Sequence, residues 1–269
     1  MHFRITFSVL KPGQLLPLSY QYELSAWIYK QIERTDSEFA SFLHEEGYYN
    51  EGKRFKLFTF SNLFIPPPYE IIGDRIKIGA TEISFTLSFL VKKAATNLII
   101  ALFKQRTFRL GDKITQIELK VKEVNSIDVL LNDSATYRLR TTSPMMVSAP
   151  KIGNNNKLRH QYLSPIDTDF EHYFFQNLLR KYKTALAHEL IEEIDIGQPM
   201  KFKLTSDKVK KQGVRINAYT PRATKIIGYQ FNFEIQAPKE LVRIGLMAGF
   251  GGDNAIGFGA TFLIKKAAN

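Results

Sequence analysis

A glycine-rich stretch near the end of the chain has residue types and a spacing that could hold phosphate groups. It reads GLMAGFGGDNAIGFGATFL over residues 245–263, and six glycines fall within fifteen positions of it. Glycine is useful where φ must be positive or where another backbone must come close. A loop of this kind can present backbone N–H groups to phosphates or bases at short range. We therefore expect a binding loop, with a set of tight turns as the structural alternative.

Two common nucleotide-binding motifs do not fit this stretch. A dinucleotide-binding G-x-G-x-x-G follows a strand and opens a helix. Here the pattern predicts a helix before the glycines and a strand after them, and only ten residues follow Gly259. A P-loop would end in Gly-Lys-Ser or Gly-Lys-Thr, and this run does not. What is left is a helix-to-strand loop rich in backbone N–H groups.

An excess of basic side chains indicates a polyanionic partner, and nucleic acid is the first to test. The formal net charge of the 269 residues is +11, which folding alone does not require. Between residues 201 and 225 a single acid, Asp207, accompanies Lys201, Lys203, Lys208, Lys210, Lys211, Arg215, Arg222 and Lys225. We expect a hairpin with its tip near Gly213, acting as an arm or groove lining for a phosphate backbone. The alternative is a solvated pair of strands in a protein kept soluble by its charge.

His44 is the strongest candidate for proton transfer, because the reference pKa of imidazole lies near neutrality. It falls in the last turn of a predicted helix, where a protonated imidazole also interacts well with the helix dipole, so a structural role is open. His160 is its one rival, since the basic loop NNNKLRHQY could close over RNA. The other histidines are expected on or beside regular elements: His2, His172 and His188.

Composition excludes several classes of site. The chain has no cysteine, which rules out disulfides and thiolate metal sites. No carboxylates are paired at metal-site spacing, and His44-Glu45-Glu46 is a weak ligand pattern, so we expect neither a two-metal nuclease nor any cofactor. The best apolar run, AATNLIIALF, is about half the length that crosses a bilayer. The first residues lack the apolar core of a signal peptide, so we expect a cytoplasmic protein without a membrane partner.

Strand and helix periodicities alternate in the same order in both halves. In the first half we expect strands at 2–9, 56–64, 82–91 and 113–124, an extra hairpin, and helices at 20–34, 37–46 and 93–105. In the second half a strand, YRLRTTSPMMV, precedes a helix with a T-D-F-E capping box on Thr168 and an apolar stripe of Phe170, Phe174, Leu178 and Tyr182. MKFKLTSD, GVRINAY and IIGYQFNFEIQ follow as strands, then a short helix from Pro238 to Met247 and a last strand, FGATFLI. Both halves thus have the order β-α-β-β-α-β, which predicts an α+β fold of two tandem ferredoxin-like, RRM-like domains at 1–134 and 135–269.

Several motifs together resemble one known family. Gly249-Phe-Gly251, five residues and then Gly257-Phe-Gly259 match the C-terminal glycine-rich signature of the CRISPR-associated endoribonucleases that process precursor CRISPR RNA, the sixth Cas family. The segments PLSYQYELSAWIYKQI, EFASFLHEEGY and KLFTFS resemble its N-terminal blocks in the same order, and TTSPMMV resembles the start of its second domain. The similarity spans nearly the whole chain.

The resemblance implies metal-independent RNA cleavage in which the upstream 2′-hydroxyl attacks the adjacent phosphate, leaving a 2′,3′-cyclic phosphate and a 5′-hydroxyl. The family's most frequent catalytic set, carried onto this sequence, is Tyr29, His44 and Lys56, all in the first domain. The implied partner is CRISPR repeat RNA, read as a hairpin or a single strand; an effector complex and a second copy of the chain are further partners left open. The candidate RNA contacts are Lys53, Arg54, Lys208, Lys210, Lys211, Arg215, Gly249, Gly251, Asn254, Gly257 and Gly259.

The reaction itself asks for such groups: a base for the 2′-proton, an acid for the leaving 5′-oxygen and a cation for the phosphoryl oxygens. Tyr29 can orient the nucleophile or donate to the phosphate, although it could also be an amphipathic residue at the edge of the core. Lys56 would supply the cation, but strand alternation places it on the face of Phe58 and Phe60, and Lys53 or Arg54 could replace it.

Two functions stay open on the sequence alone. The favoured one is a repeat-specific endoribonuclease, because all three residue types of the implied catalytic set are present. The alternative is a non-catalytic RNA-binding subunit that keeps the fold and the basic surface but does not cut.

Overall fold

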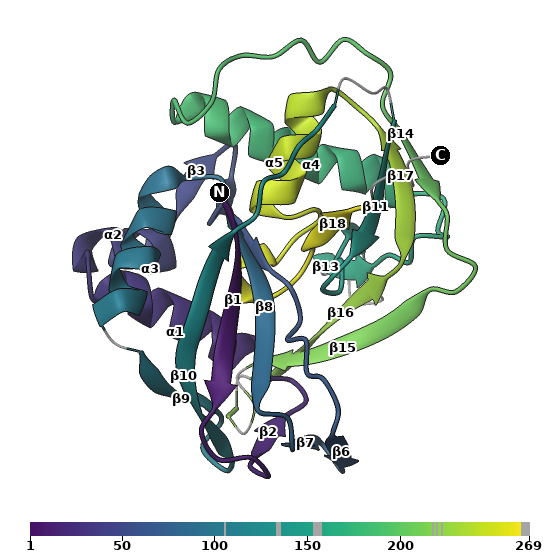
Figure 1. Cartoon of the computed structure of the whole chain (residues 1–269). Helices are drawn as coiled ribbons and strands as arrows, with labels where there is room; N and C mark the ends of the chain where they lie inside the picture. Colours follow the sequence, from purple (N-terminus) through teal and green to yellow (C-terminus); the bar gives the residue numbers. More distant parts are fainter. Residues whose placement is uncertain are drawn as a thin grey trace.

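The N-terminal half is built on a five-stranded antiparallel sheet of order β5-β8-β1-β10-β9. The computed structural model describes residues 1–104, 106–132, 136–152, 158–216, 218, 220–221 and 223–264. The sheet consists of β1 (His2–Val9), β5 (Phe58–Phe60), β8 (Glu82–Phe89), β9 (Thr107–Gly111) and β10 (Gln116–Ser126). Helices α1 (Gln21–Glu33) and α3 (Lys92–Lys104) pack against each other on one side of it (Figure 1). As the periodicity predicts, α1 buries Leu24, Ile28 and Ile32 at four-residue intervals.

The C-terminal half repeats this plan with a four-stranded antiparallel sheet of order β14-β17-β11-β18. Its strands are β11 (Thr136–Thr141), β14 (Lys201–Leu204), β17 (Asn232–Gln236) and β18 (Thr261–Leu263), and its helices are α4 (Phe170–Ala187) and α5 (Lys239–Ala248). The predicted stripe of α4, from Phe170 to Tyr182, is buried. In both sheets the second, third, first and fourth strands of a β-α-β-β-α-β unit lie side by side, which is the ferredoxin-like arrangement. The expected boundary at 134/135 lies outside the described residues.

Short additional elements surround the two sheets. In the N-terminal half they are a three-stranded sheet of β2 (Leu15–Pro17), β7 (Arg75–Ile78) and β6 (Tyr69–Ile72), the hairpin of β3 (Tyr48–Asn50) and β4 (Lys53–Phe55), and the helical turns α2 (Ser37–Ser41) and η1 (Phe42–Glu46). In the C-terminal half they are the hairpins of β12 (Ser148–Ile152) with β13 (Leu158–Tyr162) and β15 (Lys210–Ile216) with β16 (Thr224–Gln230), and the short turn η2 (Asn254–Ile256).

Two predictions about the second half are wrong in detail. The segment IIGYQFNFEIQ forms two strands in different sheets, because the amide of Phe231 donates to the Thr141 hydroxyl instead of to a strand partner. The capping box on Thr168 does not form. The helix begins at Phe170, and the Glu171 carboxylate accepts from the amide of Phe202 at 2.8 Å.

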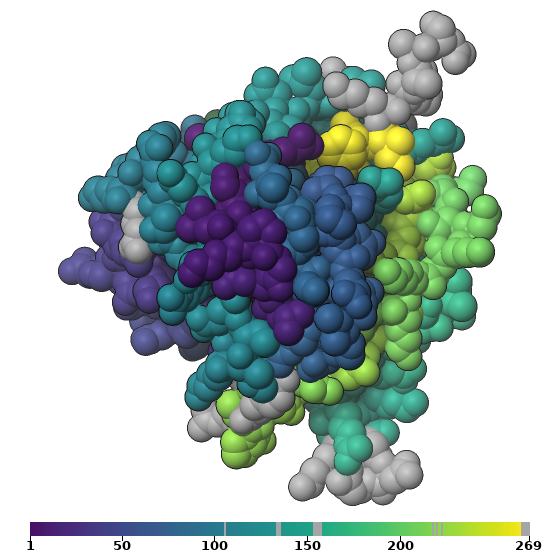
Figure 2. Space-filling model, turned by 60° about the horizontal axis from the view of Figure 1, so that its bottom comes forward, coloured from purple at the N-terminus to yellow at the C-terminus, as the bar shows by residue number. Residues whose placement is uncertain are grey.

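The two halves share one continuous hydrophobic core. Helix α5 contacts β5 and β8 of the N-terminal half, and η2 contacts α1 and β5. Two side chains of the N-terminal half donate to the backbone of the glycine-rich stretch: Ser25 to the carbonyl of Ala255 and Thr59 to that of Phe258. In the space-filling view, light-green atoms of the C-terminal half meet the N-terminal half at the bottom (Figure 2). The helices of the described part of the chain include none that is long and apolar enough to span a membrane.

Candidate functional site

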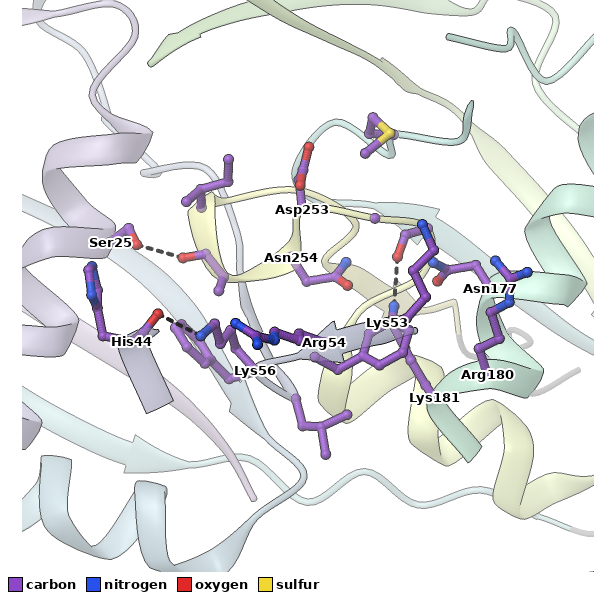
Figure 3. A pocket seen from close by; sticks show the side chains of 18 of the residues that line it. Ser25, His44, Lys53, Arg54, Lys56, Asn177, Arg180, Lys181, Asp253 and Asn254 are labelled. Carbon is purple, nitrogen blue, oxygen red and sulfur yellow. Dashed lines mark hydrogen bonds between the residues drawn. The ribbon is translucent and has the colours of Figure 1, made fainter. Parts of the chain in front are cut away.

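A cleft of about 1310 Å³ lies where the two halves meet. The N-terminal half contributes α1, η1 and β4 to its lining, and the C-terminal half contributes α4, the β12–β13 hairpin and the glycine-rich loop (Figure 3). Among the described residues it is lined by three acids, Glu33, Glu45 and Asp253, and by six cations, Lys30, Lys53, Arg54, Lys56, Arg180 and Lys181. This balance favours an anionic ligand, because an excess of one charge along a cleft concentrates the electrostatic field there.

Tyr29 and His44 meet in this cleft. Their rings pack edge to face with centroids 5.0 Å apart, and the Tyr29 ring also packs edge to face with Phe58 at 5.6 Å. His44 is exposed, whereas Tyr29 is half-buried, and desolvation raises the pKa of its phenol well above the usual value. Tyr29 is therefore a protonated hydrogen-bond donor near neutral pH, and it cannot act there as the base.

An irregular helical turn presents His44 to the cleft. The Asp36 carboxylate accepts from the Phe39 amide and caps α2, after which the chain widens into a π-helical turn over Phe42–Glu46. The turn closes through the amide of Gly47, which donates to the carbonyl of Phe42 at 2.7 Å. Gly47 has φ +65°, and a Cβ there would lie 2.8 Å from the carbonyl oxygen of Phe55. Glycine is thus required where the chain turns sharply from His44 into β3.

Lys56 lies beneath this turn and not on the predicted strand face. Leu57 has φ +53°, which interrupts the strand before β5, so the alternation of Lys56 with Phe58 and Phe60 is wrong. The Lys56 ammonium donates to the carbonyl of His44 at 2.6 Å (Figure 3). Partial burial and the neighbouring Arg54 lower its pKa. Lys56 therefore holds the backbone that carries His44.

Lys53 and Arg54 are the other basic residues beside His44. Both are on β4, both are exposed and both line the cleft. Neither forms an ion pair with a described residue; the Arg54 guanidinium lies 5.9 Å from the ring centre of Tyr49. Their charges are available to a ligand.

The glycine-rich loop has a different reason for its glycines from the close approach of RNA that we expected. Gly249, Gly251, Gly257 and Gly259 all have positive φ and are all buried. A Cβ on Gly259 would lie 1.8 Å from the carbonyl oxygen of Phe250, and one on Gly257 would lie 2.8 Å from the ring of Phe60. Glycine is therefore demanded by the protein's own packing, and of these four glycines Gly251 alone lines the cleft.

Two polar side chains clamp this loop. The amide nitrogen of Asn254 donates to the carbonyls of Phe250 and Phe258, at 3.1 and 3.0 Å. The ammonium of Lys181, on α4, donates to the carbonyls of Gly249 and Gly251, at 2.5 and 2.6 Å. Figure 3 shows one of these bonds as a dashed line from Lys181. Lys181 is fully buried, and this desolvation lowers its pKa to about 7. The sequence analysis missed Lys181. Its position directly before Tyr182, a member of the apolar stripe of α4, was a signal that this lysine is buried.

His160 lies in the same cleft as His44. It is on β13, a strand where we expected a loop, and faces the cleft with its cross-strand neighbour Pro150. Part of the expected loop, 153–157, lies outside the described residues. The other histidines are elsewhere: His2 is buried against Ser88 with its pKa lowered to about 4 by desolvation, His188 contacts the carbonyl of Tyr49, and His172 is exposed on α4.

The basic hairpin forms a second surface, separate from the cleft. Lys208, Lys210, Lys211 and Arg215 are exposed, and none of them lines the cleft. Gly213 is not at the tip, as expected, but in the middle of β15, opposite Ile227. The hairpin extends toward the start of α1, where the Arg215 amide lies 3.4 Å from the Ser19 hydroxyl (Figure 1). Arg222 lies outside the described residues.

The described residues contain no group of three or more histidine, cysteine or acidic side chains that could hold a metal ion.

Comparison with known proteins agrees with this architecture. The family described as "CRISPR-associated protein Cas6, N-terminal" matches residues 15–125, and "CRISPR associated protein Cas6, C-terminal" matches residues 125–262. A "putative CRISPR-associated endoribonuclease-like protein Cas6" of Pyrococcus furiosus is 25% identical over 99% of this chain and 100% of its own length. A "CRISPR-associated endoribonuclease Cas6 1" of Methanocaldococcus jannaschii is 23% identical over 91% of this chain and 86% of its own.

Solved structures share the fold. The product of a Cas6-related gene from Pyrococcus furiosus superposes with a TM-score of 0.81 at 23% identity, covering 99% of both chains. A structure described as "an RAMP protein binding different RNA substrates" gives a TM-score of 0.80 at 22% identity, covering 98% of this chain and 100% of the other. Since a family description matches each half, the chain belongs to the Cas6 family of CRISPR-associated proteins.

Proposed function

We propose that this protein is a metal-independent endoribonuclease that binds CRISPR repeat RNA and cleaves precursor CRISPR RNA within the repeat. The observation that carries the proposal is the exposed His44 ring, packed against Tyr29 in a cleft with an excess of cations. Relatives that bear the name endoribonuclease support it.

The proposed reaction is an in-line displacement at phosphorus. The 2′-oxygen bonds to phosphorus and loses its proton, while the bond to the 5′-oxygen breaks and that oxygen gains a proton. The products are a 2′,3′-cyclic phosphate and a 5′-hydroxyl, so no water molecule is consumed. His44 serves as the proton-transfer group, because its exposed imidazole lines the cleft and has nitrogens that accept or donate a proton.

The neighbouring residues have separate roles in this proposal. Tyr29, held in its protonated form, donates to the 2′-oxygen or to the phosphate. Lys53 and Arg54 neutralise the charge that gathers on the phosphoryl oxygens. Lys56 holds the turn in place by donating to the carbonyl of His44. Its positive charge adds to that of Lys53 and Arg54 near the phosphate. The basic hairpin contributes affinity for the phosphate backbone outside the cleft.

A non-catalytic RNA-binding subunit is the second candidate. It is favoured by the names of two relatives, the Pyrococcus furiosus protein called endoribonuclease-like and a Pyrococcus horikoshii protein called "endoribonuclease-like protein Cas6nc", 23% identical over 98% of this chain. An effector complex or a second copy of the chain as partners, and a cytoplasmic location, are also predictions.

The test uses repeat RNA from the CRISPR array of the genome that encodes the protein. We expect cleavage to persist in excess chelator, to give a cyclic phosphate, and to stop when the sugar just upstream of the cut is 2′-deoxy. Binding of the deoxy RNA should be unchanged within a few-fold. Cleavage of the deoxy RNA would exclude the proposed chemistry, whereas binding without any cleavage of the all-ribose RNA would favour the non-catalytic subunit.

A further inference from the structure

Asp253 is an acid in a cleft whose charges are mostly positive. It is on the glycine-rich loop, and its side chain is exposed in the cleft (Figure 3). The carboxylate forms no hydrogen bond or ion pair with any residue that the structure describes. The cation that acts on it is Lys181, whose ammonium donates to the carbonyls of Gly249 and Gly251 instead. Asp253 thus has acceptor capacity that no described residue uses.

The backbone holds Asp253 in an unusual conformation. Its φ of +55° and ψ of +31° are left-handed, a region that Asp and Asn tolerate better than most residues and that is often found at functional sites. The residues on both sides are fixed: the Gly252 amide donates to the carbonyl of Met146 at 2.8 Å, and Asn254 clamps the loop. The backbone of Asp253 is therefore held in place by its neighbours, and the carboxylate extends from it into the cleft.

Apolar side chains line the cleft beside this carboxylate. Met146 lies over Gly252, where a Cβ would be 2.6 Å from its terminal methyl carbon, and Ile256 is three residues after Asp253. Both pack on a small apolar cluster that Tyr162 also joins. Partial desolvation raises the pKa of the Asp253 carboxyl, although the residue is exposed to the cleft. An acceptor with apolar flanks suits a flat aromatic ligand that carries donors on its edge.

We propose that Asp253, with Met146 and Ile256, forms a nucleobase site that selects guanine in the bound RNA. A phosphate would be repelled by the carboxylate, so the ligand at this point of the strand is a base. Guanine presents N1–H and the N2 amino group side by side, which matches the two oxygens of one carboxylate. Adenine and cytosine offer one amino donor beside an acceptor, and uracil one imide N–H. Proteins read unpaired RNA bases along this Watson–Crick edge. The inference rests on the proposed RNA-binding function.

The experiment measures binding of the same repeat RNA by fluorescence anisotropy, with each guanine replaced in turn by inosine. Inosine lacks only the N2 amino group, so it removes one donor. We expect one position at which inosine weakens binding by the intact protein about tenfold, the value for a lost hydrogen bond to a charged group. In Asp253→Asn the affinities of the guanine and inosine RNAs at that position should agree within about twofold, because an amide cannot accept both donors. Asparagine tolerates positive φ, so the loop keeps its conformation.

Glu33→Gln is the matched control, since it removes the same charge from the same cleft. It should keep the inosine penalty. A wild-type protein that cleaves the repeat RNA but shows no guanine sensitive to inosine would overturn the site and leave the proposed function standing. An Asp253→Asn variant that keeps the full inosine penalty would also overturn it. Absence of any RNA binding would overturn both proposals.

Discussion

The turn that carries His44 and the glycine-rich loop line the same cleft, and both depart from regular backbone geometry. In the first, the departure leaves the His44 side chain exposed above a supporting lysine. In the second, it packs glycines inside the protein, where each Cβ would strike a neighbour. Internal packing thus requires the glycines of the conspicuous motif, and the proposed proton transfer depends on a single side chain in a less conspicuous turn. The following predictions separate these two roles.

Replacing His44 by alanine should have the largest effect. We expect the single-turnover cleavage rate of repeat RNA to fall by roughly 10² to 10⁴, as for the loss of a general acid or base. Binding should stay within a few-fold, since one imidazole adds little to contacts with many phosphates. His172→Ala, an exposed histidine outside the cleft, is the control and should cleave normally. Full activity of His44→Ala would refute its role.

Gly259→Ala should affect folding more than RNA. Strain at φ +74° and a Cβ 1.8 Å from the Phe250 carbonyl oxygen should lower the free energy of unfolding by several kcal/mol, from about 1–3 kcal/mol of strain and about 1–3 kcal/mol of overpacking. Gly13→Ala, also at positive φ but with no atom within 4 Å of its Cβ, isolates the strain. Urea unfolding measures both. A stable Gly259→Ala that has lost RNA binding would show instead that RNA contacts this glycine.

Lys181 should make the stability of the loop depend on pH. Its pKa is about 7 in the folded protein and near 10.5 when unfolded, so between these values the unfolded chain binds more protons and stability rises with pH. We expect the wild type to gain up to about 1.4 kcal/mol per pH unit relative to Lys181→Met between pH 7 and 9. Urea unfolding at several pH values tests this, with the exposed Lys183→Met as the control. Equal pH dependence of wild type and Lys181→Met would contradict it.

Charge reversal in the basic hairpin should weaken the affinity for RNA without changing the cleavage rate. Reversing the charges of Lys208, Lys210 and Lys211 should weaken RNA binding and reduce the slope of log affinity against log salt by about 2, if each contacts one phosphate of a single strand. The cleavage rate at saturating RNA should be unchanged, because these residues do not line the cleft. If the salt dependence of binding has the same slope as in the unmodified protein, the hairpin does not contact the RNA.

His160→Ala should have the smallest effect, within about threefold on the cleavage rate. It lines the cleft on the β12–β13 hairpin and could touch RNA, but the proposal assigns it no proton transfer. A loss as large as that of His44→Ala would show that the two histidines act together and that the chemistry is not confined to the turn of His44.

Periodicity predicted most of the fold, since both ferredoxin-like units follow from where helix and strand patterns alternate. The errors lie where tertiary contacts override local pattern. Glu171 bonds to the amide of Phe202 and leaves the capping box unformed, and Phe231 turns the chain between two sheets. Neither partner could be located from one sequence.

Some residues of the candidate site were predictable from the sequence, but its geometry was not. His44 and Tyr29 line one cleft, yet the positive φ of Leu57 moves Lys56 off the strand and under His44. The glycine pattern predicted unusual backbone but could not tell an external ligand from internal packing. Asp253 was not predicted as a site residue, because a single acidic residue belongs to no recognisable sequence motif.

The contacts of the glycine-rich loop with α1 and β5 affect how the protein unfolds and loses activity on heating. Ser25 and Thr59 of the N-terminal half donate to this loop, and Gly257 packs against Phe60. The cleft wall and the junction between the halves are therefore the same structure. Loosening one loosens the other, so the temperature of inactivation should coincide with that of unfolding, and no folded but inactive form should accumulate between them.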